Sequence, residues 1–149
     1  MIPATDYRVA HSTSEDVNQQ IHREMQERVA HFRHASARAI RQRLVELDHE
    51  WDTERTLEAN AATVALTGTV LAATVDRRWI YLPMMVSVFL LQHAVQGWCP
   101  PLPIIRRLGV RTTREIEEER RALEALLDHR DATVHDGAAA AVVASGHVV

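Results

Sequence analysis

The chain has 149 residues, a net charge of −3 at neutral pH and a single cysteine. The chain has 17 arginines and no lysine. This excludes chemistry that needs a lysine nucleophile or a Schiff base on lysine. One cysteine excludes an internal disulfide, and the negative net charge gives no reason to expect nucleic-acid binding.

The first part of the chain predicts a flexible start followed by a long helix. Residues 1–14 contain Pro3 and no apolar run, so we expect a flexible segment and no signal peptide. Apolar residues then recur at steps of three and four from Val17 to Trp51, apart from one gap between Phe32 and Ile40, which predicts one amphipathic helix of about 35 residues. We assign residues 15–56 to this cytoplasmic helix, with a short break near Asp52.

The apolar stripe of this helix is narrow and needs a partner surface. We expect a cytoplasmic protein to bind residues 17–51. The alternatives are a second copy of the chain in a coiled coil, the helices that follow, or a membrane surface.

Two apolar segments follow, Ala59–Val75 and Trp79–Gln96, and only Asp76-Arg77-Arg78 separates them. As helices, the first spans about 25 Å and the second, carried on to Pro100, about 30 Å, against about 30 Å for a bilayer core. The connection is too short for a loop, so we expect a tight antiparallel hairpin of the transmembrane type. The alternative is a soluble helical bundle with this hairpin as its core, because the first segment is short and rich in Thr, Gly and Ala.

Small and aromatic side chains have distinct positions in these segments. Small residues recur along one side of the first segment, and such residues let helix backbones approach closely in a membrane. We predict helix packing through Ala61, Ala65, Gly68, Thr69 and Ala73. Aromatic rings near the ends of the second segment suit an interfacial belt. The predicted interface anchors are Trp79, Tyr81 and Trp98.

After the hairpin we expect short helices. The turn Gly97-Trp98-Cys99-Pro100 and the prolines after it must end the second apolar helix. Residues 114–127 form a charged helix, which Thr112 and Glu115 open as a capping box, and whose residues 117–121 we expect to be solvated. Residues 128–149 are Ala- and Val-rich and predict a flexible tail. Most arginines near the hairpin lie before its first helix or after its second helix, and few lie at the turn between them. By the positive-inside rule, both termini are therefore expected in the cytoplasm.

Three short stretches resemble a known family. They are Asp76-Arg77-Arg78-Trp79, Gly97-Trp98-Cys99-Pro100 and Leu108-Gly109-Val110-Arg111-Thr112. Together, over residues 57–113, they resemble the YgaP-like inner-membrane transmembrane domain family. The resemblance implies a bacterial protein of the inner (cytoplasmic) membrane that associates with other copies through its hairpin. Some members of that family follow a rhodanese sulfurtransferase domain. This chain has a long amphipathic helix there and no rhodanese active-site loop, so sulfurtransferase activity is not carried over.

Cys99 is the weak candidate for a catalytic residue. Arg106 and Arg107 follow closely and could lower its pKa. The hypothesis is that Cys99 acts as a sulfur relay or thiol-redox group, and the alternative is a small side chain that packs the turn.

Metal ligation has little support in the sequence. Glu46 and His49 share a helix face, as do His31 and His34, but a di-iron bundle needs a second Glu-x-x-His motif. No metal or other cofactor is therefore expected.

The sequence as a whole predicts an all-α protein of the bacterial inner membrane that is not an enzyme. The hairpin of residues 57–113 anchors it in membrane lipid and forms homo-oligomers. The first alternative is a sulfur-relay or thiol-redox accessory that acts through Cys99, and the second is a soluble helical oligomer or binding module.

Overall fold

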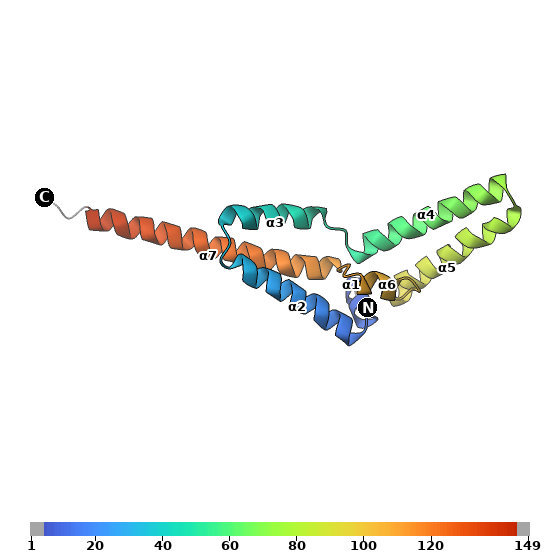
Figure 1. Ribbon diagram of the computed structural model, residues 1–149, viewed down its shortest axis with the longest axis horizontal. Coiled ribbons are helices and arrows are strands. Elements are labelled where there is room, and N and C mark those ends of the chain that lie inside the picture. Colours follow the sequence, from blue (N-terminus) through green and yellow to red (C-terminus); the bar gives the residue numbers. More distant parts are fainter. Residues whose placement is uncertain (1–4, 146–149) are drawn as a thin grey trace. The chain divides into compact units, whose positions relative to one another are not determined.

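The computed structural model describes the backbone of residues 5–145 and the side chains of residues 7–133. All regular structure in this range is helical, which confirms the predicted all-α class. The helices, in chain order, are α1 (Thr5–His11), α2 (Glu15–Phe32), α3 (Ala37–His49), α4 (Thr53–Thr74), the 3₁₀ turn η1 (Arg77–Ile80), α5 (Tyr81–Gln96), α6 (Leu102–Arg107) and α7 (Thr113–Ser145) (Figure 1).

The chain forms two compact units, and α2 and α7 each contribute to both. The first unit contains the chain up to Glu24 together with Glu50–Ile116, and the second contains Met25–His49 and the chain from Glu117 onward.

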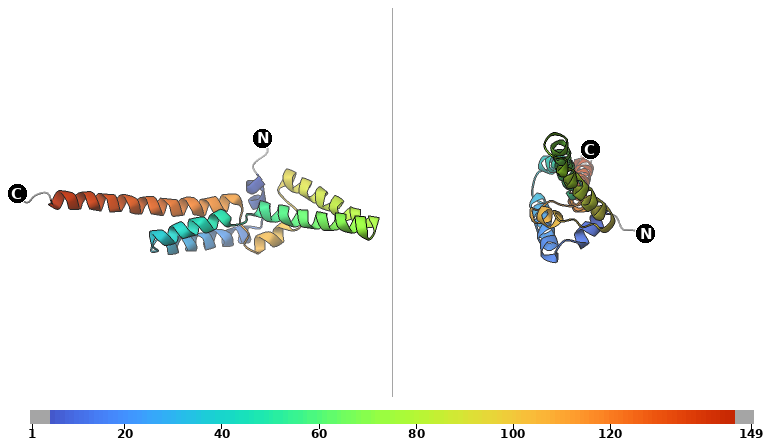
Figure 2. Two further views of the ribbon diagram at one scale, coloured as in Figure 1. Left: turned by 90° about the horizontal axis from the view of Figure 1, so that it is seen from above. Right: turned by 90° about the vertical axis from the view of Figure 1, so that its right-hand side faces the viewer.

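In the first unit, α4 and α5 lie side by side and η1 joins them (Figures 1 and 2). The predicted break near Asp52 is confirmed, because the Asp52 carboxylate accepts a hydrogen bond from the backbone N–H of Arg55 at 2.8 Å and starts α4. α5 ends at Gly97, whose positive φ of 74° is accessible to glycine and whose N–H donates to the carbonyl of His93 at 2.7 Å.

The core of the first unit lies at the open end of this helix pair. Val9, Leu57, Cys99, Leu102 and Ile105 form one buried cluster. Helix α1 therefore belongs to the core, which differs from the flexible segment predicted for residues 1–14. Among the described side chains of α1, Val9 is the one buried apolar residue, and the Arg8 guanidinium donates to the carbonyls of Ala94 and Val95 at 2.9 and 2.6 Å. Such contacts leave no periodic signal in the sequence.

The second unit consists of three helices: α2 from Met25, α3, and α7 from Glu117. Ile40, Leu47 and Leu123 are buried in it. The carboxylate of Glu119 is also fully buried and accepts hydrogen bonds from Nε of Arg28 at 3.2 Å and Nε of Arg43 at 2.9 Å. The expected solvation of residues 117–121 is therefore wrong for Glu119.

The single helix predicted over residues 15–56 is divided in the structure. α2 ends at Phe32 and α3 begins at Ala37, after a turn that contains neither Pro nor Gly. Ser36 Oγ accepts from the N–H of Ala39 at 3.2 Å, and the Arg130 guanidinium donates to the carbonyls of Arg33, at 2.7 Å, and Ala35. These bonds satisfy backbone groups at the turn. The Ser36 cap is local in sequence, whereas Arg130 is too distant for a local pattern to predict its bonds.

Helix α7 is longer than the charged helix predicted over residues 114–127. It continues to Ser145, through most of the predicted flexible tail, and residues 146–149 lie outside the described residues. Alanine is the best helix former, so this Ala-rich sequence suits a continued helix.

Candidate functional site

The inner face of the helix pair combines small side chains of α4 with larger ones of α5. Gly68 is buried, and a Cβ atom built on it would lie only 2.7 Å from Cδ of Pro83 and 3.1 Å from Cβ of Leu82. Ala61 and Ala65 lie on the same face and are half-buried. Thr69 and Ala73, from the same predicted packing set, are exposed. The predicted set is therefore divided between the inner and outer faces of α4.

The outer face of α5 is apolar and is not covered by other described residues. Its exposed side chains, Met84, Met85, Val88, Leu91 and Val95, each have 56–67% of their surface accessible. Leu66 and Val70 extend this surface on α4. Among the described residues, Arg77–Gln96 is the one helical stretch with the length and composition of a membrane span, and 6% of its apolar window is buried. An apolar surface of this extent commonly marks a contact with a partner or a membrane.

The polar groups on the outside of α4 are satisfied within the helix. Each of four threonine hydroxyls donates to the carbonyl four residues earlier, at 2.7–2.8 Å. They belong to Thr63, Thr67, Thr69 and Thr74. The exposed face of α4 therefore offers few unpaired donors to its surroundings.

Aromatic side chains lie at both ends of the helix pair. Trp79 and Tyr81 are exposed beside η1, and Trp98 is exposed beyond the end of α5. Trp51, half-exposed, lies just before α4, and the guanidinium carbon of Arg55 is 4.8 Å from its ring centroid. Trp51 was predicted to belong to the apolar stripe of the preceding helix, and its position beside α4 was not predicted.

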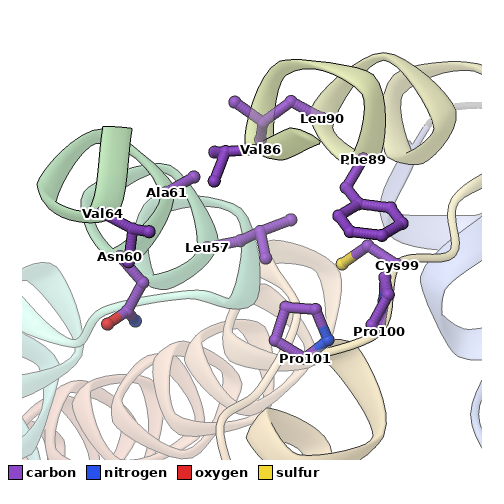
Figure 3. Close-up of a pocket in the computed structure, with 10 residues that line it drawn as sticks. All are labelled: Leu57, Asn60, Ala61, Val64, Val86, Phe89, Leu90, Cys99, Pro100 and Pro101. Carbon is purple, nitrogen blue, oxygen red and sulfur yellow. The ribbon is translucent and has the colours of Figure 1, made fainter. Parts of the chain in front are cut away.

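An apolar pocket of about 250 Å³ opens between α4 and α5 near their ends. Figure 3 shows that Leu57 and Ala61 of α4, Phe89 of α5, and the turn residues Cys99 and Pro101 line it. Gly97 holds the backbone in the conformation that brings this turn back under the helix pair, and a Cβ at Gly97 would overlap Arg8. Cys99 and Pro100 of the predicted turn therefore line the pocket, whereas Gly97 and Trp98 of the same turn are not among its lining residues.

The environment of Cys99 does not favour a reactive thiolate. Its side chain is buried, and burial raises the pKa of the thiol, with a further increase from the negative charge of Glu54. The expectation that Arg106 and Arg107 lower this pKa is wrong. A thiol with a raised pKa is protonated at neutral pH and is a weak nucleophile.

Arg106 instead fixes the segment that follows the pocket. It is 1% exposed, and its two terminal nitrogens each lie 2.7 Å from an oxygen of the Glu115 carboxylate. The remaining donors reach Thr13 Oγ1, Asn18 Oδ1 and the carbonyl of Val110 at 3.0–3.2 Å. All five N–H groups of this guanidinium thus have acceptors.

Glu115 has two roles at this position. Its carboxylate accepts from the N–H of Thr112 at 2.7 Å, and its own N–H donates to Thr112 Oγ1 at 3.3 Å, which confirms the predicted capping box. Burial acts to raise the pKa of Glu115, but the hydrogen bonds from Arg106 and Thr112 outweigh it, so that pKa is lowered. The capping box was visible in the sequence, whereas the pairing with Arg106 was not.

A second buried arginine connects the start of α4 to the start of α7. Arg111 is 3% exposed and binds both carboxylate oxygens of Glu50, at 2.7 and 2.6 Å. The backbone N–H and the hydroxyl of Thr53 both donate to the carbonyl of Arg111, at 2.8 and 3.0 Å. These bonds hold the first turn of α4 in place.

His93 and Glu54 connect the two helices close to the pocket. Nε2 of His93 lies 3.1 Å from Oε2 of Glu54, and the histidine is 4% exposed. Nδ1 of His93 and Oε1 of Glu54 are buried without a hydrogen-bond partner among the described residues. This pair lies between the first turn of α4 and the last turn of α5, where it bridges them.

The described residues contain no group of three or more His, Cys, Asp or Glu side chains that could hold a metal ion. The His31/His34 and Glu46/His49 pairs considered from the sequence therefore have no third ligand within that range.

Comparisons with known proteins were made by family, by sequence and by structure. No family model matches the chain, and no curated protein and no solved structure matches it significantly.

Proposed function

We propose that the protein is a membrane-anchored helical protein of the bacterial inner membrane. In this proposal α4 and α5 insert into the bilayer as a hairpin and associate with other copies, and both chain ends remain in the cytoplasm. Residues 17–51, which include parts of both units, then bind a cytoplasmic partner. The protein has a structural or interaction role and is not an enzyme.

One observation carries the proposal: the outer face of α5 exposes Met84, Val88 and Leu91, and this helix contains no Asp, Glu, Lys or Arg. At about 2 Å per residue for η1 and about 1.5 Å per residue for α5, the stretch Arg77–Gln96 spans about 30 Å. This matches the thickness of a bilayer core, which is about 30 Å. The aromatic side chains at both ends of the pair have the positions expected of interfacial anchors.

Carbonate and urea extraction of membranes that contain the protein tests the proposal. We expect the protein to stay in the pellet through both washes. A matched pair of variants sharpens the result, because Val88 of α5 and Val45 of α3 are 61% and 56% exposed. A carboxylate near the centre of a membrane helix costs about 3 kcal/mol, so Val88→Glu should lower the resistant fraction while Val45→Glu leaves it unchanged.

A soluble helical oligomer is the second candidate, and the composition of α4 favours it. α4 does not qualify as a membrane span among the described residues, and threonines occupy much of its outer face. In such an oligomer a second copy would cover the outer face of α5. Recovery of the protein in the carbonate supernatant, as a defined multimer, would support this candidate and exclude the anchor.

The sulfur-relay or thiol-redox alternative has less support. It needs an accessible thiolate, whereas Cys99 is 2% exposed and burial raises the pKa of its thiol. Trapping a labelled persulfide on Cys99 in the full chain would restore this alternative. Failure to label it under native conditions, with labelling only after unfolding, would agree with a packing role.

A further inference from the structure

The turn between α2 and α3 concentrates positive charge in a protein whose net charge is −3. No Asp or Glu lies between Glu27 and Glu46. This stretch contains instead the basic residues Arg28, His31, Arg33, His34, Arg38, Arg41 and Arg43.

The arginines of this stretch divide into two groups. Arg28 and Arg43 bind the buried carboxylate of Glu119 and stabilise the second unit. Arg33, Arg38 and Arg41 are exposed, and no carboxylate of the described residues forms a salt bridge with any of them. By contrast, Arg106, Arg111 and Arg120 are each paired with an acid.

The turn that carries these charges is well fixed. The Arg130 guanidinium lies against it and donates to the carbonyls of Arg33 and Ala35, and Ser36 caps the start of α3. The backbone carbonyls of the turn are therefore occupied by a fourth arginine, which adds positive charge at the same place. A fixed turn loses less conformational entropy on binding than a flexible one does.

We propose that this turn binds the phosphate groups of anionic phospholipids through Arg33, Arg38 and Arg41. Guanidinium groups donate paired hydrogen bonds to phosphate oxygens and suit this ligand better than ammonium groups do. The inference rests on the proposed membrane anchor, since an inserted hairpin would tether the second unit to the membrane through the connecting chain. Arg41 precedes the start of α4 by twelve positions, and the chain is helical up to His49, which limits the reach to about 26 Å.

Nucleic acid fits this surface less well. The stretch has no Trp or Tyr, and its one Phe, Phe32, is half-buried, so it lacks the large exposed rings on which single-stranded bases stack most strongly. The negative net charge of the protein opposes long-range attraction to a polyanion, whereas an anchored turn meets lipid phosphates at high local concentration.

The expected effect follows from the attraction of each arginine to an anionic leaflet. Each arginine raises the equilibrium constant for binding an anionic leaflet about fivefold, so the three together raise it about a hundredfold. This attraction is screened by salt, because it acts between exposed charges.

The test uses the full chain bound to vesicles of phosphatidylcholine, with and without phosphatidylglycerol, and measures amide hydrogen exchange over residues 33–41. We expect phosphatidylglycerol to slow exchange there at low salt, and added salt to restore it. The variant Arg33→Gln/Arg38→Gln/Arg41→Gln should lose the effect. The control variant Arg23→Gln/Arg107→Gln/Arg121→Gln removes the same charge from other exposed positions and should keep it.

Three outcomes would overturn the inference: exchange that is insensitive to phosphatidylglycerol, equal loss in both triple variants, or slowing by a short DNA duplex but not by lipid. Carbonate extraction of the same vesicles reports separately on the hairpin. Loss of the protein in carbonate, with arginine-dependent slowing retained, would contradict the anchor while the phosphate site stands. Resistance to carbonate without that slowing would contradict the phosphate site alone.

Discussion

The helix pair α4–α5 and the three-helix unit of α2, α3 and α7 distribute polar and apolar side chains in opposite ways. The three-helix unit buries Ile40, Leu47 and Leu123 and exposes most of its charged residues. The helix pair buries Gly68 and half-buries Ala61 and Ala65, and it exposes large apolar side chains such as Leu91. One region therefore has the pattern of a water-soluble bundle, and the other has an apolar exterior.

The difference also extends to buried charge. The three-helix unit encloses Glu119 between two arginines, whereas α4 and α5 have no charged residue between Glu58 and Asp76 or between Arg78 and the end of α5. A buried ion pair is compatible with a unit that folds in water, whereas a stretch without charged residues is what a bilayer core requires. This contrast is the physical basis of the proposed anchor.

The largest expected effect is in the three-helix unit. Glu119→Ala leaves Arg28 and Arg43 side by side without their common carboxylate, which should cost about 3–5 kcal/mol of stability. Hydrogen exchange should accelerate in α2, α3 and α7 and stay unchanged in α5. Glu124→Ala, at an exposed position of the same helix, is the control. Equal destabilisation by the two variants would show that Glu119 is not a buried partner.

The close contact between α4 and α5 gives the next effect. In Gly68→Leu the new Cβ atom would lie 2.7 Å from Cδ of Pro83. Such overpacking lowers the stability of the fold by about 1–3 kcal/mol. Faster hydrogen exchange in α4 and α5, but not in α3, is the expected result. Ala62→Leu makes a similar change on the exposed side of α4 and should have little effect. If both variants behave alike, Gly68 does not lie in a tight interface.

Acid should weaken the junction after the hairpin. The pKa of Glu115 is lower in the folded protein than its ordinary value, so its contribution is fully present above that value and is lost as the pH falls through the lowered pKa. Thermal unfolding followed from neutral pH to below about pH 4 should show this loss. Glu115→Gln should be less stable at neutral pH and should show a smaller further loss in acid. An unchanged pH profile would contradict the pairing with Arg106.

The smallest effect is expected at the surface of the three-helix unit. Asp48 is mostly exposed and pairs with Arg120 at 2.6 Å, and exposed ion pairs contribute about 1 kcal/mol or less. Chemical denaturation of Asp48→Asn should therefore show a change below about 1 kcal/mol. A loss as large as that of Glu119→Ala would remove the distinction between buried and surface pairs.

Local patterns in the sequence predicted the helical class, the break at Asp52 and the capping box of Thr112 and Glu115. These features depend on residues within a few positions of one another. The division of the predicted long helix was missed, although the apolar repeat has a gap between Phe32 and Ile40 and Ser36 caps α3 within that gap. The bonds from Arg130, almost a hundred residues away, could not be predicted from a local pattern. The packing of α1 was missed for the same reason, because Val9 joins a core supplied by distant segments.

The surfaces were predicted less well than the elements. The four-residue repeat of small side chains on α4 did not distinguish the inner Gly68 from the exposed Thr69 and Ala73. Helix periodicity identifies a face only when one face is clearly apolar, and both faces of α4 carry small residues. The burial of Cys99 and Arg106 could not be predicted either, because it depends on how the turn packs under the helices.

The most direct test of the anchor measures what surrounds the outer face of α5. Spin labels at Met84, Val88, Leu91 and Val95, introduced one at a time as cysteines in a Cys99→Ala background, report accessibility to oxygen and to a water-soluble nickel complex in lipid vesicles. The account predicts high oxygen and low nickel accessibility along this face, and the opposite for Val45→Cys on α3. High nickel accessibility along α5, equal to that at residue 45, would contradict it.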